Sequence, residues 1–167
     1  MTEKKPISTR FSVDADETYL VEWLLNPGIL QWFPLSDRRE IEDAARFWIS
    51  FSKYNAALTA LWDGKPCGLA TLYLPAFRKI SHQCLFAIIV SEEHRGKGVG
   101  THLLKELMEL AKDRFKIELL HLEVYDGNPA VNLYKKLGFV EYGYQRRFVK
   151  EGENHYLGKI MMQKRLF

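Results

Sequence analysis

The sequence predicts an α/β domain, because segments with the periodicity of strands alternate with segments that have the periodicity of helices. Residues 7–13 alternate between apolar and polar side chains, as in a half-buried strand. Farther along, an apolar run at 84–90 is followed by leucines at helical spacing between residues 103 and 110. The predicted order is strand, two helices, three strands, helix, strand, helix and two strands. Because no repeat or low-complexity linker interrupts this order, we expect residues 1–167 to form one domain.

Two helices are predicted after the first strand. Asp14 is followed three residues later by Glu17, a spacing typical of a capping box, and the next apolar residues fit a helix that ends at the Asn-Pro-Gly sequence of 26–28. Residues 29–34 are predicted to be an apolar connector. A second helix is predicted from Asp37, again with an acidic residue three positions on.

The rest of the chain is predicted to supply six strands and two helices. The strands are predicted at 56–62, 67–74, 84–90, 117–124, 139–149 and 155–166. The first two are joined by Asp63-Gly64-Lys65-Pro66, a hairpin signal, and the last two by a turn at 151–154. One helix follows the third of these strands, and a short helix at 129–137 follows the fourth.

The composition excludes several classes of protein. Hydrophobic residues make up 47% of the chain and aromatic residues 13%, too many for a disordered protein, and no apolar run approaches the roughly 20 residues of a membrane span. The net charge of +3 comes from bases dispersed among acids, which does not indicate nucleic-acid binding. No apolar signal segment follows the first six residues, and Cys67 and Cys84 lie on predicted strands. We therefore expect a soluble cytoplasmic protein without a disulfide that binds neither nucleic acid nor membrane.

The strongest functional signal is a glycine-rich segment between the apolar strand at 84–90 and the leucine-rich helix. Its sequence is Arg95-Gly96-Lys97-Gly98-Val99-Gly100, followed by Thr101. Glycine at every second position lets backbone N–H groups turn toward a ligand and lets phosphate oxygens approach closely. The N-terminus of the following helix adds the positive end of its dipole. The segment therefore predicts a pyrophosphate-binding site.

The spacing of the glycines restricts the ligand. A Walker A loop requires Ser or Thr after Gly-Lys, and here Gly98 takes that place. A Rossmann fingerprint requires a differently placed third glycine and an acidic residue about 20 residues later, and neither condition is met cleanly. Arg95, Gly98 and Gly100 instead resemble the acetyl-CoA loop of the GNAT superfamily of N-acyltransferases. That loop begins with Arg or Gln, which is followed by any two residues and then by Gly. After one further residue of any kind comes Gly or Ala.

A second segment supports the same resemblance. Residues 122–139 resemble the other GNAT hallmark, which is a strand, an Asn turn and a short helix that ends in Leu-Gly-Phe. The common form of the family places Ala three residues and Tyr seven residues after the Asn. Here Ala130 and Tyr134 stand two and six residues after Asn128. A shorter Asn-Pro-Ala form also occurs in the family, so this departure bears mainly on Asn128 as a CoA contact.

The resemblance implies a GNAT fold with a single mixed, mostly antiparallel sheet flanked by helices, in the order β-α-α-β-β-β-α-β-α-β-β. It also implies acetyl-CoA as cosubstrate and no metal. The residues that it implies as CoA contacts are Ile88, Ile89, Val90, Arg95, Gly96, Lys97, Gly98, Val99, Gly100, Thr101, Asn128 and Lys136. For Lys136, a solvated helix face is the alternative.

Acetyl transfer to an amine requires a neutral amine and a proton donor for the thiolate that leaves. The resemblance assigns the donor to Tyr134, with an aromatic core residue as the alternative. Glu123 stands at the end of a Leu-Glu-Val strand and is the candidate base, and the alternative is a surface glutamate paired with a lysine. The other titratable groups considered are His82, His94, His121 and His155, whose spacing does not indicate a metal site.

The resemblance implies an acceptor groove walled by the first two helices and the last hairpin. Trp32, Phe33 and Tyr73 are the candidate acceptor contacts. Acidic residues that either attract an amine or cap helices are Asp14, Asp16, Asp37, Glu40, Glu42 and Asp43. The acceptor is expected to be the primary amine of a small molecule (a polyamine, an aminosugar or an amino acid) or of a protein N-terminus. Polyamine enzymes of similar layout carry Glu where Leu85 stands, which counts against a polyamine.

Two other functions remain open at this point. One is a catalytically silent GNAT-fold module that binds CoA as a sensor or scaffold, although such a module has no need of a proton donor at Tyr134. The other is a nucleotide-binding domain of unrelated fold, which would require a second phosphate or ribose motif. The first hypothesis remains direct transfer in a ternary complex with Tyr134 as general acid. Exposed sheet edges would also permit a homodimer.

Overall fold

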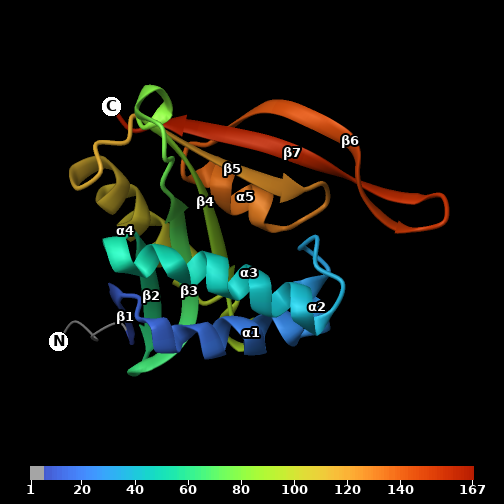
Figure 1. Ribbon diagram of the computed structural model, residues 1–167, viewed down its shortest axis with the longest axis horizontal. Helices are drawn as coiled ribbons and strands as arrows, with labels where there is room; N and C mark the ends of the chain where they lie inside the picture. Colours follow the sequence, from blue (N-terminus) through green and yellow to red (C-terminus); the bar gives the residue numbers. More distant parts are fainter. Residues whose placement is uncertain (1–5) are drawn as a thin grey trace.

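A seven-stranded sheet organises the protein, for which a computed structural model describes residues 6–167 (Figure 1). The strands are β1 (Ile7–Phe11), β2 (Ala57–Trp62), β3 (Lys65–Tyr73), β4 (Gln83–Val90), β5 (Leu119–Tyr125), β6 (Val140–Gly152) and β7 (His155–Arg165). Their order in the sheet is β1-β2-β3-β4-β5-β7-β6. Neighbouring strands are antiparallel except β4 and β5, which are parallel. The predicted mixed, mostly antiparallel sheet is confirmed.

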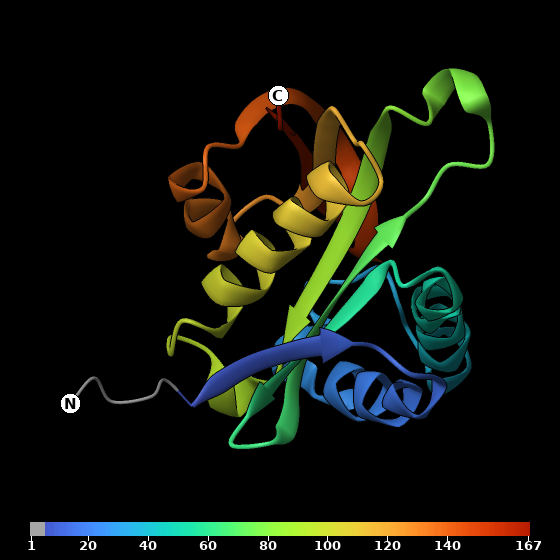
Figure 2. The same cartoon turned by 90° about the vertical axis from the view of Figure 1, so that its left-hand side faces the viewer.

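Helices cover both faces of this sheet. They are α1 (Glu17–Leu25), α2 (Pro27–Leu30), α3 (Arg38–Ser50), α4 (Val99–Asp113) and α5 (Ala130–Lys136). Figure 2 shows α4 and α5 on one face and α1 and α3 on the other. The predicted order of elements is confirmed, except that the connector at 29–34 begins within the short helix α2. Asn26 caps α2 by accepting a hydrogen bond from the Gly28 N–H at 2.8 Å.

Two hydrophobic clusters, one on each face, hold the helices against the sheet. Leu103 and Leu107 of α4 are fully buried in the first cluster, where they pack near Phe86 of β4. Leu20 of α1 is fully buried in the second cluster, together with Ile89 of β4. Each fully buried leucine contributes about 2 kcal/mol through removal of its side chain from water. Because successive side chains of a strand point to opposite faces, β4 contributes to both clusters.

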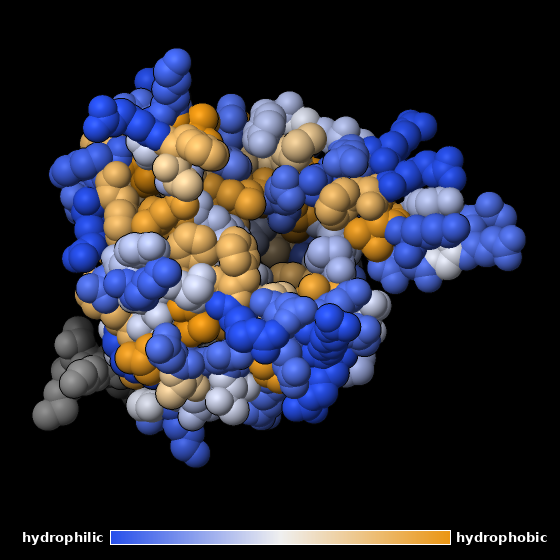
Figure 3. Space-filling model, in the orientation of Figure 1, coloured by the Kyte–Doolittle hydropathy of each residue, from blue (hydrophilic) through white to orange (hydrophobic). Residues whose placement is uncertain are grey.

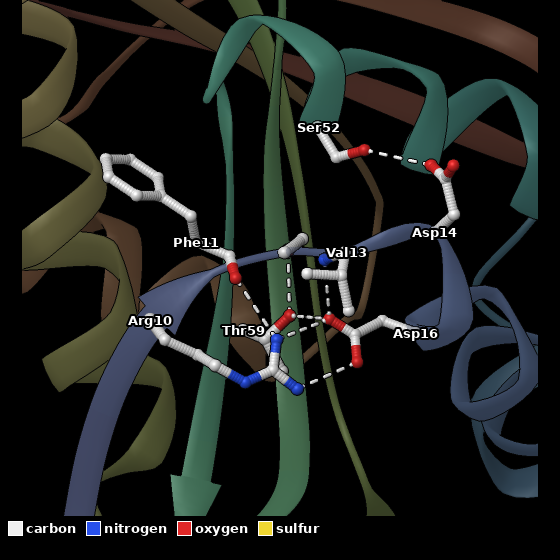
Figure 4. Close-up of polar contacts among 8 residues, drawn as sticks. Arg10, Phe11, Val13, Asp14, Asp16, Ser52 and Thr59 are labelled. Atoms are coloured by element: carbon white, nitrogen blue, oxygen red, sulfur yellow. Dashed lines mark hydrogen bonds and ion pairs between the residues drawn. The ribbon is translucent and has the colours of Figure 1, made fainter.

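The start of α1 differs from the prediction. The capping box predicted at Asp14 does not form, because residues Asp14–Asp16 make a 3₁₀ turn and the Asp16 carboxylate accepts a hydrogen bond from the Val13 N–H at 3.0 Å. Asp16 also accepts hydrogen bonds from Arg10 and Thr59 (Figure 4). A buried carboxylate requires several donors. Asp16, rather than Asp14, therefore ties the start of α1 to the sheet.

The two parallel strands pair at one end only. Residues 83–85 of β4 pair with residues 119–121 of β5, and beyond them the strands separate. The remaining part of β4, Phe86–Val90, stays paired with β3 on its other edge. The separation therefore leaves a gap in the middle of the sheet, bordered by backbone groups that the β4–β5 ladder does not use.

The last two strands form a long hairpin that projects from the body of the protein (Figure 1). Its pairing shifts between Gln145 and Val149, and Arg147 in this stretch has a φ of +53°. Such a bulge bends a strand and re-aims its side chains. Phe148 packs here against Tyr125 of β5, with ring centroids 6.2 Å apart. The base of the hairpin is thus packed onto the strand that borders the gap.

Within residues 6–167, no helix combines the length and the hydrophobicity needed to span a membrane. The expectation that the chain starts without a signal segment also involves residues 1–5, which lie outside the described residues.

Candidate functional site

The gap between β4 and β5 opens into a cavity of about 450 Å³. Figure 3 shows a hollow in this region, with hydrophobic side chains around it. The lining consists of 86–90 of β4, 94–96, 98, 100 and 101 of the glycine loop and α4, 122–124 of β5, 128–130, 133 and 134 of the Asn turn and α5, and Trp32 and Phe33. The two sequence motifs, which are about thirty residues apart, therefore line one cavity.

This cavity reaches both faces of the sheet. Phe86 and Leu122 belong to the cluster beneath α4 and α5, whereas Ala87 and Ile89 pack with the cluster beneath α1 and α3, and all four line the cavity. Glu123 alternates with Leu122, so it points to the face of α1 and α3. The two ends of the cavity are chemically different, since one carries the glycine loop and the other carries aromatic side chains and a carboxylate.

The glycine loop forms an open cradle at the N-terminus of α4. Gly98 is the N-cap residue with a φ of +86°, and a Cβ built on it would meet no atom within 4 Å. Gly100 and Thr101 belong to the first turn of α4, whose N–H groups have no partner within the helix. His94 and Arg95 line the cavity beside them. Free N–H groups, a helix dipole and a cation together favour an anion such as a diphosphate.

The separated edge of β4 offers a second set of backbone groups. Ile88, Ile89 and Val90 pair with β3 on one edge and line the cavity. An extended ligand can add to such an edge through main-chain hydrogen bonds, whatever the side chains are. The sequence signal for these three residues came from the family resemblance, and the structure places all three at the cavity.

Tyr134 lies on α5 and lines the cavity from the glycine-loop side. It is 7% exposed and packs edge-on against Phe86 and Phe139, with ring centroids 6.2 and 6.1 Å away. Burial raises the pKa of its phenol well above the ordinary value, so the hydroxyl stays protonated at neutral pH. Tyr134 is therefore a core aromatic residue that also lines the cavity.

Glu123 lies at the cavity and is paired with a lysine, as the alternative reading of the sequence expected. It is a lining residue, and its Oε1 lies 3.1 Å from the Nζ of Lys159 on β7. His121, two residues earlier, shares a hydrogen bond with Gln83. Burial lowers the pKa of His121, although the charge of Glu123 opposes this effect, so the imidazole is neutral near pH 7.

Trp32 and Phe33 reach the cavity from the segment after α2. Phe33 packs edge-on against Trp48 of α3, with ring centroids 5.8 Å apart. On the other side of α2, the Asn26 Nδ2 donates a hydrogen bond to the Glu92 Oε2 at 2.5 Å. The start of α2 is therefore in direct contact with the turn that precedes the glycine loop.

Four predicted contacts lie outside the cavity lining. They are Lys97, Val99, Lys136 and Tyr73. The Lys97 Nζ lies 5.4 Å from the ring centroid of Trp62. Val99 is the first residue of α4 and is buried, and Lys136 is exposed on α5. Tyr73 stacks on Phe47 of α3, with ring centroids 5.2 Å apart. The aromatic side chain of Tyr73 is thus engaged in a cluster with α3 rather than in the acceptor end of the cavity.

The acidic residues considered as amine attractors are engaged by local partners. Asp37 caps α3, Glu42 and Asp43 pair with Arg38 and Arg46, Glu40 accepts hydrogen bonds from Ser36, Asp14 accepts one from Ser52, and Asp16 pairs with Arg10. Among the described residues that line the cavity, Glu123 is the only acidic one. The acidic side chain of the lining is therefore a single carboxylate, which is itself paired with Lys159.

The structure differs from the sequence analysis at two residues near the cavity. Asn128 lines the cavity, but its Oδ1 accepts a hydrogen bond from the Ala130 N–H at 3.0 Å and so caps α5. Lys159 was not predicted at all. The signal that could have found it is a lone lysine within the otherwise uncharged run 156–162, because a lysine in such a run must find a partner or leave the core.

The fold and the cavity define a class of protein, an α/β domain whose sheet opens between two parallel strands onto a glycine loop at a helix N-terminus. The chain belongs to the acetyltransferase (GNAT) family, whose model matches residues 17–139. The matched region includes both the glycine loop and the Asn turn, so it contains most of the residues that line the cavity.

Curated relatives match parts of the chain. An N-alpha-acetyltransferase of Sulfurisphaera tokodaii is 42% identical over 85 residues, which cover 50% of this chain and 50% of that protein. The L-amino acid N-acetyltransferase AaaT of Escherichia coli is 30% identical over 98 residues, which cover 58% of this chain and 60% of that protein. The streptothricin acetyltransferase of Streptomyces lavendulae is 32% identical over 135 residues, which cover 79% of this chain and 69% of that protein. The chain thus matches about half the length of the first of these relatives.

Solved structures share the fold over nearly the whole chain. The yncA protein of Salmonella typhimurium, solved with its cofactor acetyl-CoA, has a TM-score of 0.80 at 22% identity, covering 97% of this chain and 95% of that one. An acetyltransferase of the GNAT family from Streptococcus pneumoniae has a TM-score of 0.74 at 26% identity, covering 95% and 99%. These likenesses confirm the predicted fold.

Proposed function

We propose that this protein is an acetyl-CoA-dependent N-acetyltransferase that transfers the acetyl group directly to a primary amine. The observation that carries the proposal is that one cavity is lined by the cradle of the glycine loop, the buried phenol of Tyr134 and the carboxylate of Glu123. Membership of the acetyltransferase family supports the same activity. A domain that only bound CoA would have no chemical use for an acid and a base in the same cavity.

The residues present fit acetyl-CoA. The open space at Gly98, the first-turn N–H groups of Gly100 and Thr101, and the cation of Arg95 suit a pyrophosphate, while the edge of β4 at 88–90 suits an extended chain with amide groups. When bound, acetyl-CoA supplies an acetyl group activated as a thioester.

Tyr134 and Glu123 take opposite roles in proton transfer. The phenol of Tyr134 is protonated at neutral pH, and because burial raises its pKa, it can donate a proton to the leaving thiolate only while it is held in line with the sulfur. Glu123 accepts the proton of the acceptor ammonium, which makes the amine nucleophilic. A primary ammonium of ordinary pKa near 10.4 is almost fully charged at pH 7, and its deprotonation costs on the order of 4–5 kcal/mol, so a positioned base is needed.

The acceptor end of the cavity favours an amine with a single positive charge beside an apolar group. Trp32 and Phe33 supply the apolar wall, and Glu123 is the only acid among the described lining residues. A polyamine would leave its second ammonium without a carboxylate, which costs free energy in a partly enclosed site. Two of the relatives are named for α-amine acceptors, an N-alpha-acetyltransferase and an L-amino acid N-acetyltransferase. We therefore place an α-amine, of an amino acid or of a peptide N-terminus, first among the acceptors.

The test is the acetyl-CoA-dependent release of thiol by the purified protein with amino acids, N-terminal peptides, lysine peptides, aminosugars and polyamines, with Tyr134→Phe alongside. We expect release with an α-amine acceptor and its suppression in the variant. Calorimetric titration with acetyl-CoA measures binding independently of turnover. Tight binding without release from any of these acceptors would instead favour the silent CoA-binding module, and no binding at all would reject both functions.

A further inference from the structure

A buried lysine lies behind Glu123, which lines the cavity. Lys159 is 8% exposed, and its Nζ is 3.1 Å from the Glu123 Oε1. The same Nζ lies 4.1 Å from the ring centroid of Phe148, so the ammonium packs on an aromatic ring as well. A buried ammonium is retained only when a partner compensates for its lost hydration. Glu123 is that partner.

The strand register explains why these two side chains meet. On β7, Lys159 is opposite Tyr125 of β5, and Met161 is opposite Glu123. Lys159 and Glu123 are therefore diagonal neighbours on one face of the antiparallel pair, within reach of long side chains. The bulge in β6 places Phe148 against the same face. The ammonium on β7 is thus contacted by a carboxylate of β5 and by an aromatic ring of β6.

Other ionisable groups near Glu123 lie on several elements. On β5, His121 is neutral and bound to Gln83, and the buried hydroxyl of Tyr125 carries no charge at neutral pH because burial raises its pKa. His94 and Arg95 of the glycine loop, and Tyr134 of α5, line the same cavity. On β7, Lys159 makes the ion pair with Glu123. Lys159 is therefore the cation in direct contact with the carboxylate.

We propose that Lys159 is a positioning residue, which holds the Glu123 carboxylate in one orientation for proton transfer from the acceptor amine. This inference rests on the proposed role of Glu123. A glutamate side chain that is 43% exposed has several accessible rotamers, and an ion pair to a rigidly packed lysine selects one of them.

Substitution of Lys159 by methionine tests this role, because methionine keeps much of the aliphatic stem and removes the charge. We expect Lys159→Met to lower kcat about tenfold while leaving the KM for acetyl-CoA unchanged, since the glycine loop is untouched. Lys159→Arg retains a cation and should restore kcat.

Lys164→Met is the matched control, because Lys164 lies on the same strand and its Nζ donates to the Leu137 carbonyl instead of to Glu123. It should leave kcat close to that of the wild type. The double variant Lys159→Met with Glu123→Gln should be no slower than Glu123→Gln alone, because both changes act through one group. A wild-type kcat in Lys159→Met, or equal losses in both backgrounds, would overturn the proposal.

A second readout does not depend on turnover. A crystal structure of Lys159→Met should show the Glu123 side chain in more than one rotamer, whereas the wild type and Lys159→Arg should show one. The same single rotamer in all three proteins would reject the role of Lys159, whatever the activity. If instead the rotamers change while Glu123→Gln turns over at the wild-type rate, Glu123 as base, and with it Lys159 as positioning residue, is rejected.

Discussion

Arg10 donates two hydrogen bonds to the carboxylate of Asp16, at 2.7 and 2.9 Å, and Asp16 is only 2% exposed. The Val13 N–H and the Thr59 hydroxyl donate two more, at 3.0 and 2.8 Å (Figure 4). This carboxylate joins β1, β2 and the start of α1. The chain continues from this point through α1 and α2 to Trp32 and Phe33, which line the cavity. The Arg10–Asp16 contact therefore anchors the start of the segment that supplies these two side chains.

We expect Arg10→Met to lower the free energy of unfolding by about 2 kcal/mol, because it leaves a buried carboxylate without its cation. The loss falls short of that for a fully buried pair, since the Arg10 side chain is 38% exposed and water partly screens the charges. Arg38→Met is the matched control, because its partner Glu42 and Arg38 itself are both exposed. It should cost less than about 0.5 kcal/mol. Urea denaturation measures both, and equal losses would contradict this account.

The contribution of Asp16 to stability should depend on pH. Burial alone would raise its pKa, but the hydrogen bonds from Arg10, Val13 and Thr59 outweigh burial and hold the pKa below its usual range. A group with a lowered pKa in the folded protein contributes stability above its unfolded value of about 4, and this stability is lost as the pH falls through the folded value. The stability difference between the wild type and Asp16→Asn should therefore be larger at pH 7 than at pH 3. Urea titrations at the two pH values measure it, and a difference that grows on acidification would contradict the sign.

Gly98→Val should abolish acetyl-CoA binding. A side chain at this position enters the open cradle at the N-terminus of α4, and the φ of +86° is unfavourable for valine. Gly64→Val is the control, because Gly64 has a φ of +83° and equally open surroundings but lies in the β2–β3 turn, outside the cavity lining. Both variants should lose similar stability. We expect only Gly98→Val to raise the Kd by tenfold or more in calorimetric titration, and a normal Kd would remove the loop from the binding site.

The elements that sequence reasoning located well are those specified by local chemistry. The glycine loop is such a case, because alternate glycines before a helix constrain the backbone wherever they occur. Asp37 is another, since it caps α3 by accepting a hydrogen bond from the Glu40 N–H at 2.9 Å. Asp14 shows where the same reasoning stops. Asp16, two residues later, accepts hydrogen bonds from Arg10 and Thr59. These contacts with distant residues stabilise the start of the helix in place of the local cap predicted at Asp14.

The features that the sequence did not reveal depend on contacts between distant segments. The apolar run at 84–90 looks the same whether β4 is paired or separated from β5, yet the separation creates the cavity. Tyr73 was expected at the acceptor end, but Phe47 of α3 stacks on its ring. Lys159 carries no motif, and its role follows from the register that places it diagonally to Glu123.

Tyr125→Phe should leave the protein as stable as the wild type or stabilise it by up to about 1 kcal/mol. The Tyr125 hydroxyl is buried, and it has no hydrogen-bond partner among the described residues. A buried hydroxyl without a partner has lost its hydration and gained nothing in return, so its removal should cost nothing. Thermal and urea denaturation measure the effect. A loss of 1 kcal/mol or more would mean that the hydroxyl has a partner that this account lacks.

Tyr134→Phe should separate binding from turnover. The ring of Tyr134 packs against Phe86 and Phe139, and phenylalanine preserves these contacts, so the Kd for acetyl-CoA and the stability should stay close to those of the wild type. The variant lacks the protonated hydroxyl at the cavity wall, so kcat should fall by roughly 100-fold or more, the usual scale for a positioned acid. Tyr125→Phe removes a hydroxyl from another buried tyrosine, one that does not line the cavity, and should keep the wild-type kcat. Steady-state thiol release by the two variants decides the matter, because an unchanged kcat in Tyr134→Phe would leave Tyr134 as a core residue alone and require another donor for the thiolate.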